Sequence, residues 1–178
     1  MLIHDHALNR FISQHKVIKF ELEGMPPEGI YKRYEPEDVS IHETIAYICR
    51  YQYVFLNRIN AISSELNPYF TPYQSNIDPQ LPFLISKRTS SLLSEINRMR
   101  DNLIRLVKEL PDNFGSRMGT HSLLGKMNLH QWLDFFLLHE SLQLFKIFKL
   151  SRRFWSEEMS QDNISKMLSM QGKMEEIA

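Results

Sequence analysis

The hydrophobic positions of this chain repeat with the period of an α-helix over four long stretches. The clearest stretch begins at Ser40 and Glu43, whose spacing is that of a capping box at a helix start. Beyond it, one helical face carries Ile41, Ile45, Ile48, Gln52, Phe55, Ile59 and Ile62. These residues recur at intervals of three and four, and Gln52 is the only polar one. The pattern predicts a helix whose apolar face packs inside a bundle.

Three further stretches show the same periodicity. We expect a first helix over residues 4–22 and a third over residues 86–110. Asn128 can cap a fourth helix, with Gln131 at the capping-box position. The face of this helix toward the bundle consists of Leu129, Leu133, Phe136, Glu140, Gln143, Ile147 and Leu150. A shorter amphipathic helix is expected from about Asp162 onward.

Helix-breaking residues separate these stretches. Glycines and prolines predict a connecting loop over residues 24–39, and four prolines predict an extended crossover over residues 66–84. Three glycines predict a further loop over residues 111–127. No stretch of any length alternates like a strand. We therefore predict one all-α domain over residues 1–178: a four-helix bundle with long crossover connections and a short C-terminal helix.

Composition limits the partners and the compartment. The 178 residues include 21 Lys and Arg against 21 Asp and Glu, and nucleic-acid-binding proteins usually carry a basic excess, so nucleic acid is not expected as a partner. The single cysteine, Cys49, excludes an internal disulfide and fits a reducing compartment. The N-terminus lacks a secretory signal, and charged residues interrupt the most apolar segment, residues 132–148. We expect a cytoplasmic protein without a membrane span.

Polar side chains interrupt two of the apolar faces near the middle of the helix. A buried polar group needs a hydrogen-bond partner or a functional role, because burying it unpaired costs free energy. If the second and fourth helices face each other, the side chains that converge are Tyr47, Gln52, His139, Glu140 and Gln143. Two roles are open for them. They line a pocket for a small ligand, or they only fix the register of the helices.

Two histidines are candidate site residues. His139 lies four residues before Gln143, so both side chains project from one helical face. Two histidines at this spacing form a common half of a metal site, but here only the first is histidine. His121 lies in the glycine-bearing loop before the fourth helix, and loops at bundle ends often line pockets. No pattern identifies a catalytic residue.

Two segments resemble motifs of the DinB-like superfamily of helical bundles, and the resemblance extends over residues 22–150. That superfamily includes thiol-dependent S-transferases and members described as metal-dependent hydrolases. Its last motif is usually His-Glu/Asp-x-His-His, and residues 139–143 occupy these positions. The positions of its first motif hold Val39-Ser40, Glu43, Tyr47, Gln52 and Arg58-Ile59.

The resemblance implies a bundle fold and a metal site with three ligand positions. By position these are Tyr47, His139 and Gln143, where the family has three histidines. A site of this composition would bind zinc or nickel weakly, so no firm cofactor is predicted. The residues expected to line the pocket around it are Gln52, Glu140 and His121.

Two functions from different classes follow. In the first, the degenerate metal site serves as a small-ligand pocket or a structural core, and the protein is not a catalyst. In the second, the protein is a metal-assisted thiol-dependent S-transferase or hydrolase, in which the metal lowers the pKa of a thiol. The sequence leaves open whether the chain is an enzyme and which small molecule it binds. The amphipathic faces are compatible with a homodimer.

Overall fold

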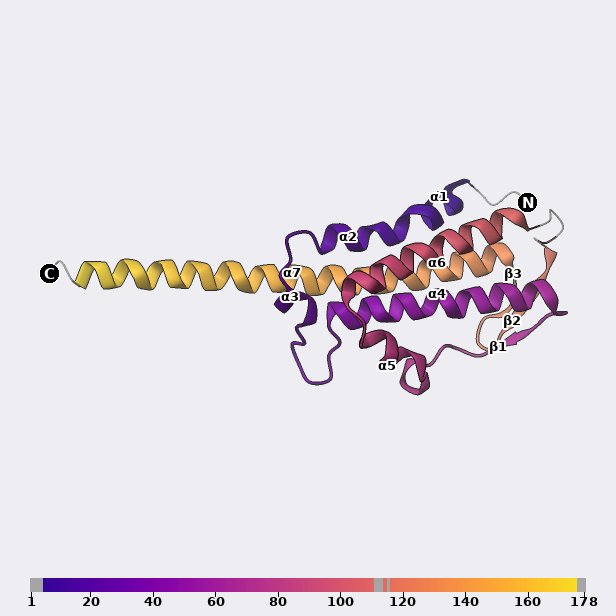
Figure 1. Cartoon of the computed structure of the whole chain (residues 1–178), viewed down its shortest axis with the longest axis horizontal. Coiled ribbons are helices and arrows are strands. Elements are labelled where there is room, and N and C mark those ends of the chain that lie inside the picture. The colour runs from indigo at the N-terminus through magenta and orange to yellow at the C-terminus, as the bar shows by residue number, and fades with distance from the viewer. Residues whose placement is uncertain (1–4, 111–113, 115, 176–178) are drawn as a thin grey trace.

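A computed structural model describes residues 5–110, 114 and 116–175, with side chains between residues 6 and 161. Long helices form an elongated bundle (Figure 1). Three of them are α4 (Ile41–Ser64), α6 (Thr89–Glu109) and α7 (Leu129–Glu175). The fourth position holds α1 (Asp5–Ser13), a 3-10 turn η1 (Gln14–Lys16) and α2 (Val17–Glu21). The predicted helical bundle with long connections is confirmed.

The sequence signals at the helix starts correspond to real caps. Ser40 and Glu43 form a capping box at the start of α4. At the start of α7, the Gln131 amide donates to the Asn128 side chain and the Asn128 amide donates to the Gln131 side chain. Every residue of the predicted apolar face of α4, Gln52 included, is at most 2% exposed. The helix therefore presents to the core the face that the periodicity predicted.

The C-terminal part differs from the prediction. The fourth helix and the expected short C-terminal helix are one continuous helix, α7, of 47 residues. The physical reason is that residues 129–171 contain neither proline nor glycine, so nothing in the sequence ends the helix near Leu150. Figure 1 shows that α7 extends well beyond the other helices.

The connections contain more regular structure than predicted. Two of them hold short helices, α3 (Pro27–Tyr31) and α5 (Gln80–Ile85), and a 3-10 turn η2 (Ser75–Ile77) precedes α5. The prediction that prolines exclude helix between residues 66 and 84 is wrong for α5. Its Pro82 lies in the first turn, where the missing amide hydrogen has no helical partner to lose.

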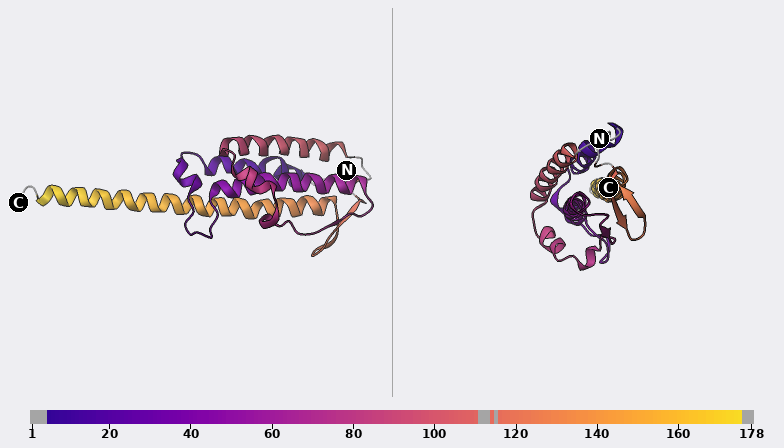
Figure 2. Two further views of the ribbon diagram at one scale, coloured as in Figure 1. Left: turned by 60° about the horizontal axis from the view of Figure 1, so that its bottom comes forward. Right: turned by 90° about the vertical axis from the view of Figure 1, so that its right-hand side faces the viewer.

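A small sheet lies at the end of the bundle opposite the projecting part of α7 (Figure 2). Its strands are β1 (Tyr69–Phe70), β2 (Met118–His121) and β3 (Gly125–Asn128), in the order β1-β2-β3. β1 runs parallel to β2, and β2 runs antiparallel to β3. Strands of two to four residues are too short for an alternating pattern, so the sequence did not predict them. The sheet joins the crossover to the loop before α7.

A buried ion pair lies among the helices of the bundle. Arg100 of α6 and Glu140 of α7 pair with side chains 0% and 2% exposed. Arg100 also donates to the Phe11 carbonyl at 2.6 Å and to the Gln52 side chain at 3.3 Å. Glu140 accepts from the side chains of Gln52 at 3.2 Å and Gln14 at 3.1 Å. This Arg100–Glu140 network therefore connects all four positions of the bundle.

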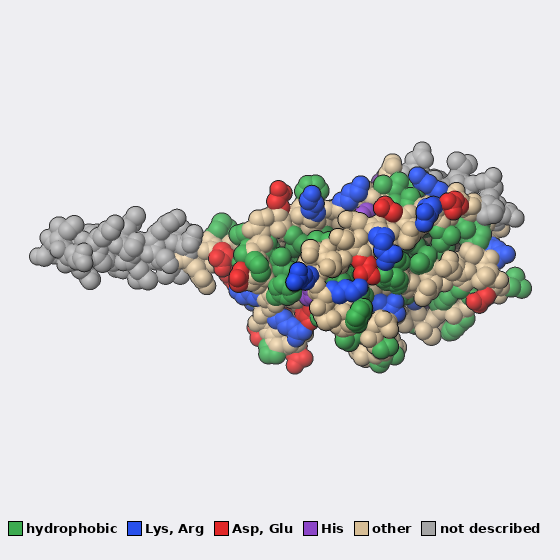
Figure 3. All heavy atoms as spheres, in the orientation of Figure 1, with side chains coloured by type: hydrophobic (Ala, Val, Ile, Leu, Met, Phe, Trp, Pro, Cys, Tyr) green, Lys and Arg blue, Asp and Glu red, His purple; other side chains and the backbone are tan. Residues whose placement is uncertain are grey.

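None of the helices among the described residues is long and apolar enough to cross a membrane. On the face shown in Figure 3, basic and acidic side chains are interspersed, and neither sign dominates.

We predict that Glu140→Leu lowers the free energy of unfolding by about 3–5 kcal/mol, because it leaves the buried charge of Arg100 unpaired. Arg100→Met with Glu140→Leu should be less destabilised than the sum of the two single variants. Urea unfolding measures all three. As a control, Asp134→Leu removes an exposed carboxylate from the same helix. A loss of less than about 1 kcal/mol in Glu140→Leu would show that the ion pair does not organise the core.

Candidate functional site

A cavity of about 250 Å³ lies between α4, α7, the segment after β1 and the β2–β3 turn. Its polar lining consists of Tyr51, Arg58, Tyr73, His121 and His139. We call it the His121–His139 cavity. It brings together two histidines that the sequence placed in different predicted elements.

His139 lies beside two tyrosine rings. Its imidazole stacks on Tyr51, with ring centroids 3.7 Å apart, and on Tyr47, with centroids 5.6 Å apart. Burial, and then the positive charge of Arg58, lower the pKa of His139 to about 4. Its Nε2 atom is buried without a hydrogen-bond partner among the described residues. At neutral pH this is a neutral imidazole with one free nitrogen.

His121 is 3% exposed and also has a free nitrogen. Its Nδ1 accepts a hydrogen bond from the Leu123 amide at 3.2 Å, so the neutral ring carries its proton on Nε2. That Nε2 is buried and has no partner among the described residues. Burial and then the charge of Arg58 hold the pKa of His121 below its ordinary value. His121 therefore lines the cavity and keeps a buried hydrogen-bond donor that no described residue uses.

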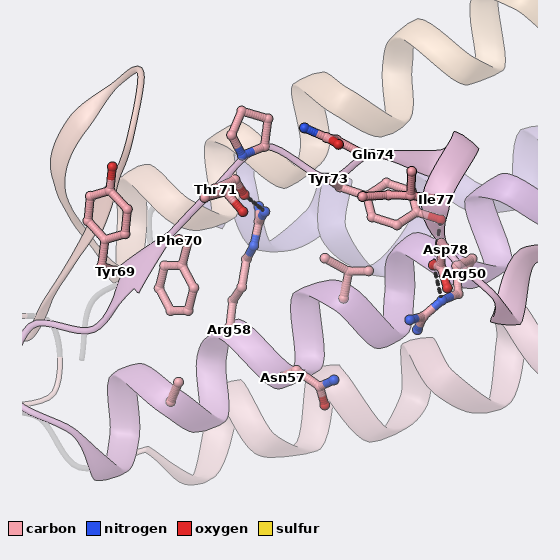
Figure 4. Close-up of a pocket in the computed structure, with 13 residues that line it drawn as sticks. Arg50, Asn57, Arg58, Tyr69, Phe70, Thr71, Tyr73, Gln74, Ile77 and Asp78 are labelled. Atoms are coloured by element: carbon pink, nitrogen blue, oxygen red, sulfur yellow. Dashed lines mark hydrogen bonds and ion pairs between the residues drawn. The ribbon is translucent and has the colours of Figure 1, made fainter.

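Arg58 supplies the positive charge of the cavity. It rises from α4 toward the segment after β1 and donates to the Thr71 carbonyl at 2.8 Å (Figure 4). It also donates to the Tyr51 hydroxyl at 3.3 Å. Its guanidinium lies 5.7 Å from the centre of the Phe70 ring and 5.4 Å from that of Trp132. The residue is only 6% exposed, and none of the carboxylates described pairs with it.

The three predicted metal ligands are divided between cavities. Tyr47 and Gln143 line a separate cavity of about 320 Å³, which His139 does not line. Gln143 and His139 share only a void of about 10 Å³, which holds one water at most. Gln52 and Glu140 also line this void, but their polar groups belong to the Arg100–Glu140 network.

The residues present do not fit a resident zinc or nickel ion. No group of three or more His, Cys, Asp or Glu side chains suited to a metal occurs among the described residues. Burial and the neighbouring Tyr51 raise the pKa of Tyr47 to about 12, so its phenol stays protonated at neutral pH. The charge of Arg58 also repels a cation near His139. The chemical nature of the ligand groups, and not only their number, is therefore unsuited to zinc or nickel.

The single cysteine, Cys49, is not a reactive nucleophile. Cys49 is fully buried on α4, and burial, followed by the charge of Glu95, raises the pKa of its thiol to about 12. It packs as a small apolar residue.

Tyr51 and Arg58 were not predicted as site residues from the sequence. A usable signal was present, because residues 51 and 58 are seven apart and therefore share one face of α4. Arg100 was missed for a similar reason. It lies four residues after Ile96 and three before Leu103, and so shares the apolar face of the helix with them.

Comparisons with known proteins identify the family and the fold. The sequence matches the DinB superfamily over residues 13–144. Among solved structures, the chain is similar to YfiT from Bacillus subtilis, described as a probable metal-dependent hydrolase with an unusual four-helix bundle topology. The TM-score is 0.73 at 17% identity, covering 84% of this chain and 86% of that one.

Two further structures share the fold. An uncharacterised protein from Clostridium difficile 630 aligns with a TM-score of 0.60 at 13% identity, covering 84% of this chain and 94% of that one. The DinB-like protein YjoA from Bacillus subtilis aligns with a TM-score of 0.51 at 14% identity, covering 84% and 92%. No curated protein matches the sequence significantly.

The lowered pKa of His139 predicts a pH dependence of stability. Between its ordinary value of 6.5 and about 4, the unfolded chain binds a proton that the folded chain does not. Stability is therefore lost as the pH falls through this window. Burial also lowers the pKa of His15 to about 4, so His139→Phe, which keeps a flat ring beside Tyr51, should make the pH profile of the urea midpoint less steep without flattening it. His6→Phe, at an exposed position, should leave the profile unchanged. Parallel profiles for wild type and His139→Phe would contradict this account.

Proposed function

This chain belongs to the DinB superfamily, and on that basis we propose that it binds a small molecule in the His121–His139 cavity without a resident catalytic metal. The observation that supports the proposal is the position of Arg58. A buried guanidinium without a carboxylate partner lies beside the only histidine retained from the family's ligand positions. Such a charge is unfavourable for a bound cation but suits an organic ligand with a polar group.

The lining of the cavity supports the same function. Aromatic and aliphatic side chains form most of its walls. Two of the lining residues, His121 and His139, each have an Nε2 atom without a partner among the described residues, and such polar groups can fix the orientation of a ligand. This combination is typical of small-molecule sites. In this proposal the Arg100–Glu140 network is structural, and it holds α4 and α7 at the separation that keeps the cavity open.

A metal-assisted hydrolase or thiol S-transferase is the competing function. It is favoured by one observation: the imidazole of His139 is neutral and its Nε2 is unpartnered, as a metal ligand requires. YfiT, described as a probable metal-dependent hydrolase, shares the fold. The weakness of this alternative is that Tyr47 and Gln143 do not line the His121–His139 cavity.

The metal content of protein purified without a histidine tag, after growth with added zinc and nickel, separates the two functions. We expect less than about 0.1 equivalent of either metal by elemental analysis, because a tight site needs at least three good ligands. We also expect no difference between wild type and His139→Ala. A stoichiometric metal that disappears in His139→Ala would refute the proposal.

An activity screen complements the metal analysis. Thiol cofactors and electrophiles are incubated with the protein, with and without added zinc or nickel. We expect turnover no higher than that of Tyr47→Phe/His139→Phe, and metal-dependent turnover above that level would favour the enzyme instead.

A further inference from the structure

We propose that the ligand of the His121–His139 cavity is a small planar organic anion whose carboxylate is bound by Arg58, Tyr51 and His121. The inference rests on the proposed function, because it names the chemical class that the cavity accepts. Three features of the cavity support it: its positive charge, its hydrogen-bond donors and its apolar walls.

The charge of the cavity is positive and not neutralised by the protein. Two other arginines of the bundle are paired with carboxylates, Arg100 with Glu140 and Arg50 with Asp78. Arg58 instead donates to a neutral carbonyl and a neutral hydroxyl, and faces aromatic rings. A buried charge without a counter-ion is costly, so an anion that reaches it relieves this cost.

Two neutral groups next to Arg58 can donate to the same anion. The Tyr51 hydroxyl accepts from Arg58, and burial raises the pKa of this phenol, so its proton is retained and available for donation. His121 carries its proton on the unpartnered Nε2, as its bond from Leu123 requires. Neutral histidine and tyrosine donors beside a guanidinium match a carboxylate, which accepts several hydrogen bonds and donates none.

The walls select a flat apolar body for the ligand. Tyr73, Phe135 and Leu124 line the same cavity as His139. Aromatic faces of this kind favour stacking with a planar ring. A volume of about 250 Å³ lies just below the usual range for drug-sized ligands, so we expect one ring with its carboxylate and little more.

A second opening near Arg58 provides a control. Arg58 also lines an outer groove of about 720 Å³, and Figure 4 shows the residues that line this groove. Asn57 lines this outer groove but not the His121–His139 cavity, whereas His121 lines only the cavity. Substitutions at these two positions therefore report which side of Arg58 the anion occupies.

Binding of benzoate and of benzamide to the wild-type protein gives the first test, which needs no variant. Calorimetry should show benzoate binding at least about tenfold tighter than its neutral isostere, the size of one charge-assisted hydrogen bond. Benzamide binding as tightly as benzoate would overturn the anion while leaving the small-molecule function intact. Binding of neither probe would overturn the inference.

Variants give the second test. Arg58→Gln keeps a donor for the Thr71 carbonyl and should weaken benzoate binding at least about tenfold, with benzamide unaffected. His121→Phe should weaken benzoate binding about threefold or more. Arg105→Gln removes an exposed arginine from α6 and Asn57→Ala changes only the outer groove, so neither should alter binding. Equal benzoate affinity in Arg58→Gln and wild type, or a loss in Asn57→Ala without one in His121→Phe, would refute the assignment.

Discussion

The ion pair between Arg100 and Glu140 is the constraint on which this bundle depends. Removing a guanidinium and a carboxylate from water costs several kcal/mol for each ion, and the cost is offset only if their hydrogen-bonding groups are satisfied. Here the partners come from every part of the bundle: Gln14, Phe11 and Gln52 complete the network. A shift of any one helix along its axis would break a bond to a buried charge, so the network fixes the register of all of them.

That register also determines where the site lies. Successive residues of a helix differ by about 100° in direction. Because Glu140 points into the network, the preceding residue, His139, points toward the tyrosines. The same reasoning applies on α4, where Gln52 joins the network and Tyr51 stacks on His139. The two buried arginines therefore differ in their partners. Glu140 neutralises the charge of Arg100, whereas none of the described carboxylates pairs with Arg58.

The helices could be predicted from sequence because periodicity and caps are local properties, and the faces and starts of α4 and α7 follow from them. The polar residues on those faces, among them Gln52 and Glu140, also led to the prediction of a site near His139. Arg58 and Arg100 were harder to find, because a charged residue beside an apolar face is usually solvated. The burial of Arg58 depends on the backbone of Thr71, which lies in the crossover.

The sheet could not be predicted for a related reason, since its bonds join distant segments. The Thr120 and Ser122 amides bond to the carbonyls of Pro68 and Phe70. The spacing of hydrophobic residues within either of these two segments does not show that the segments pair.

The single long helix α7 determines how the molecule moves in solution. At 1.5 Å per residue its 47 residues span about 70 Å, and Phe154 is the last of its described side chains that is buried. Glu157 still pairs with Lys32 at 2.8 Å, so the part beyond the bundle is residues 158–175, which add about 27 Å along one axis (Figure 1). Such a body has an anisotropic rotational diffusion: it spins quickly about the axis of α7 and tumbles slowly end over end. Its hydrodynamic radius is therefore larger than that of a sphere of the same mass.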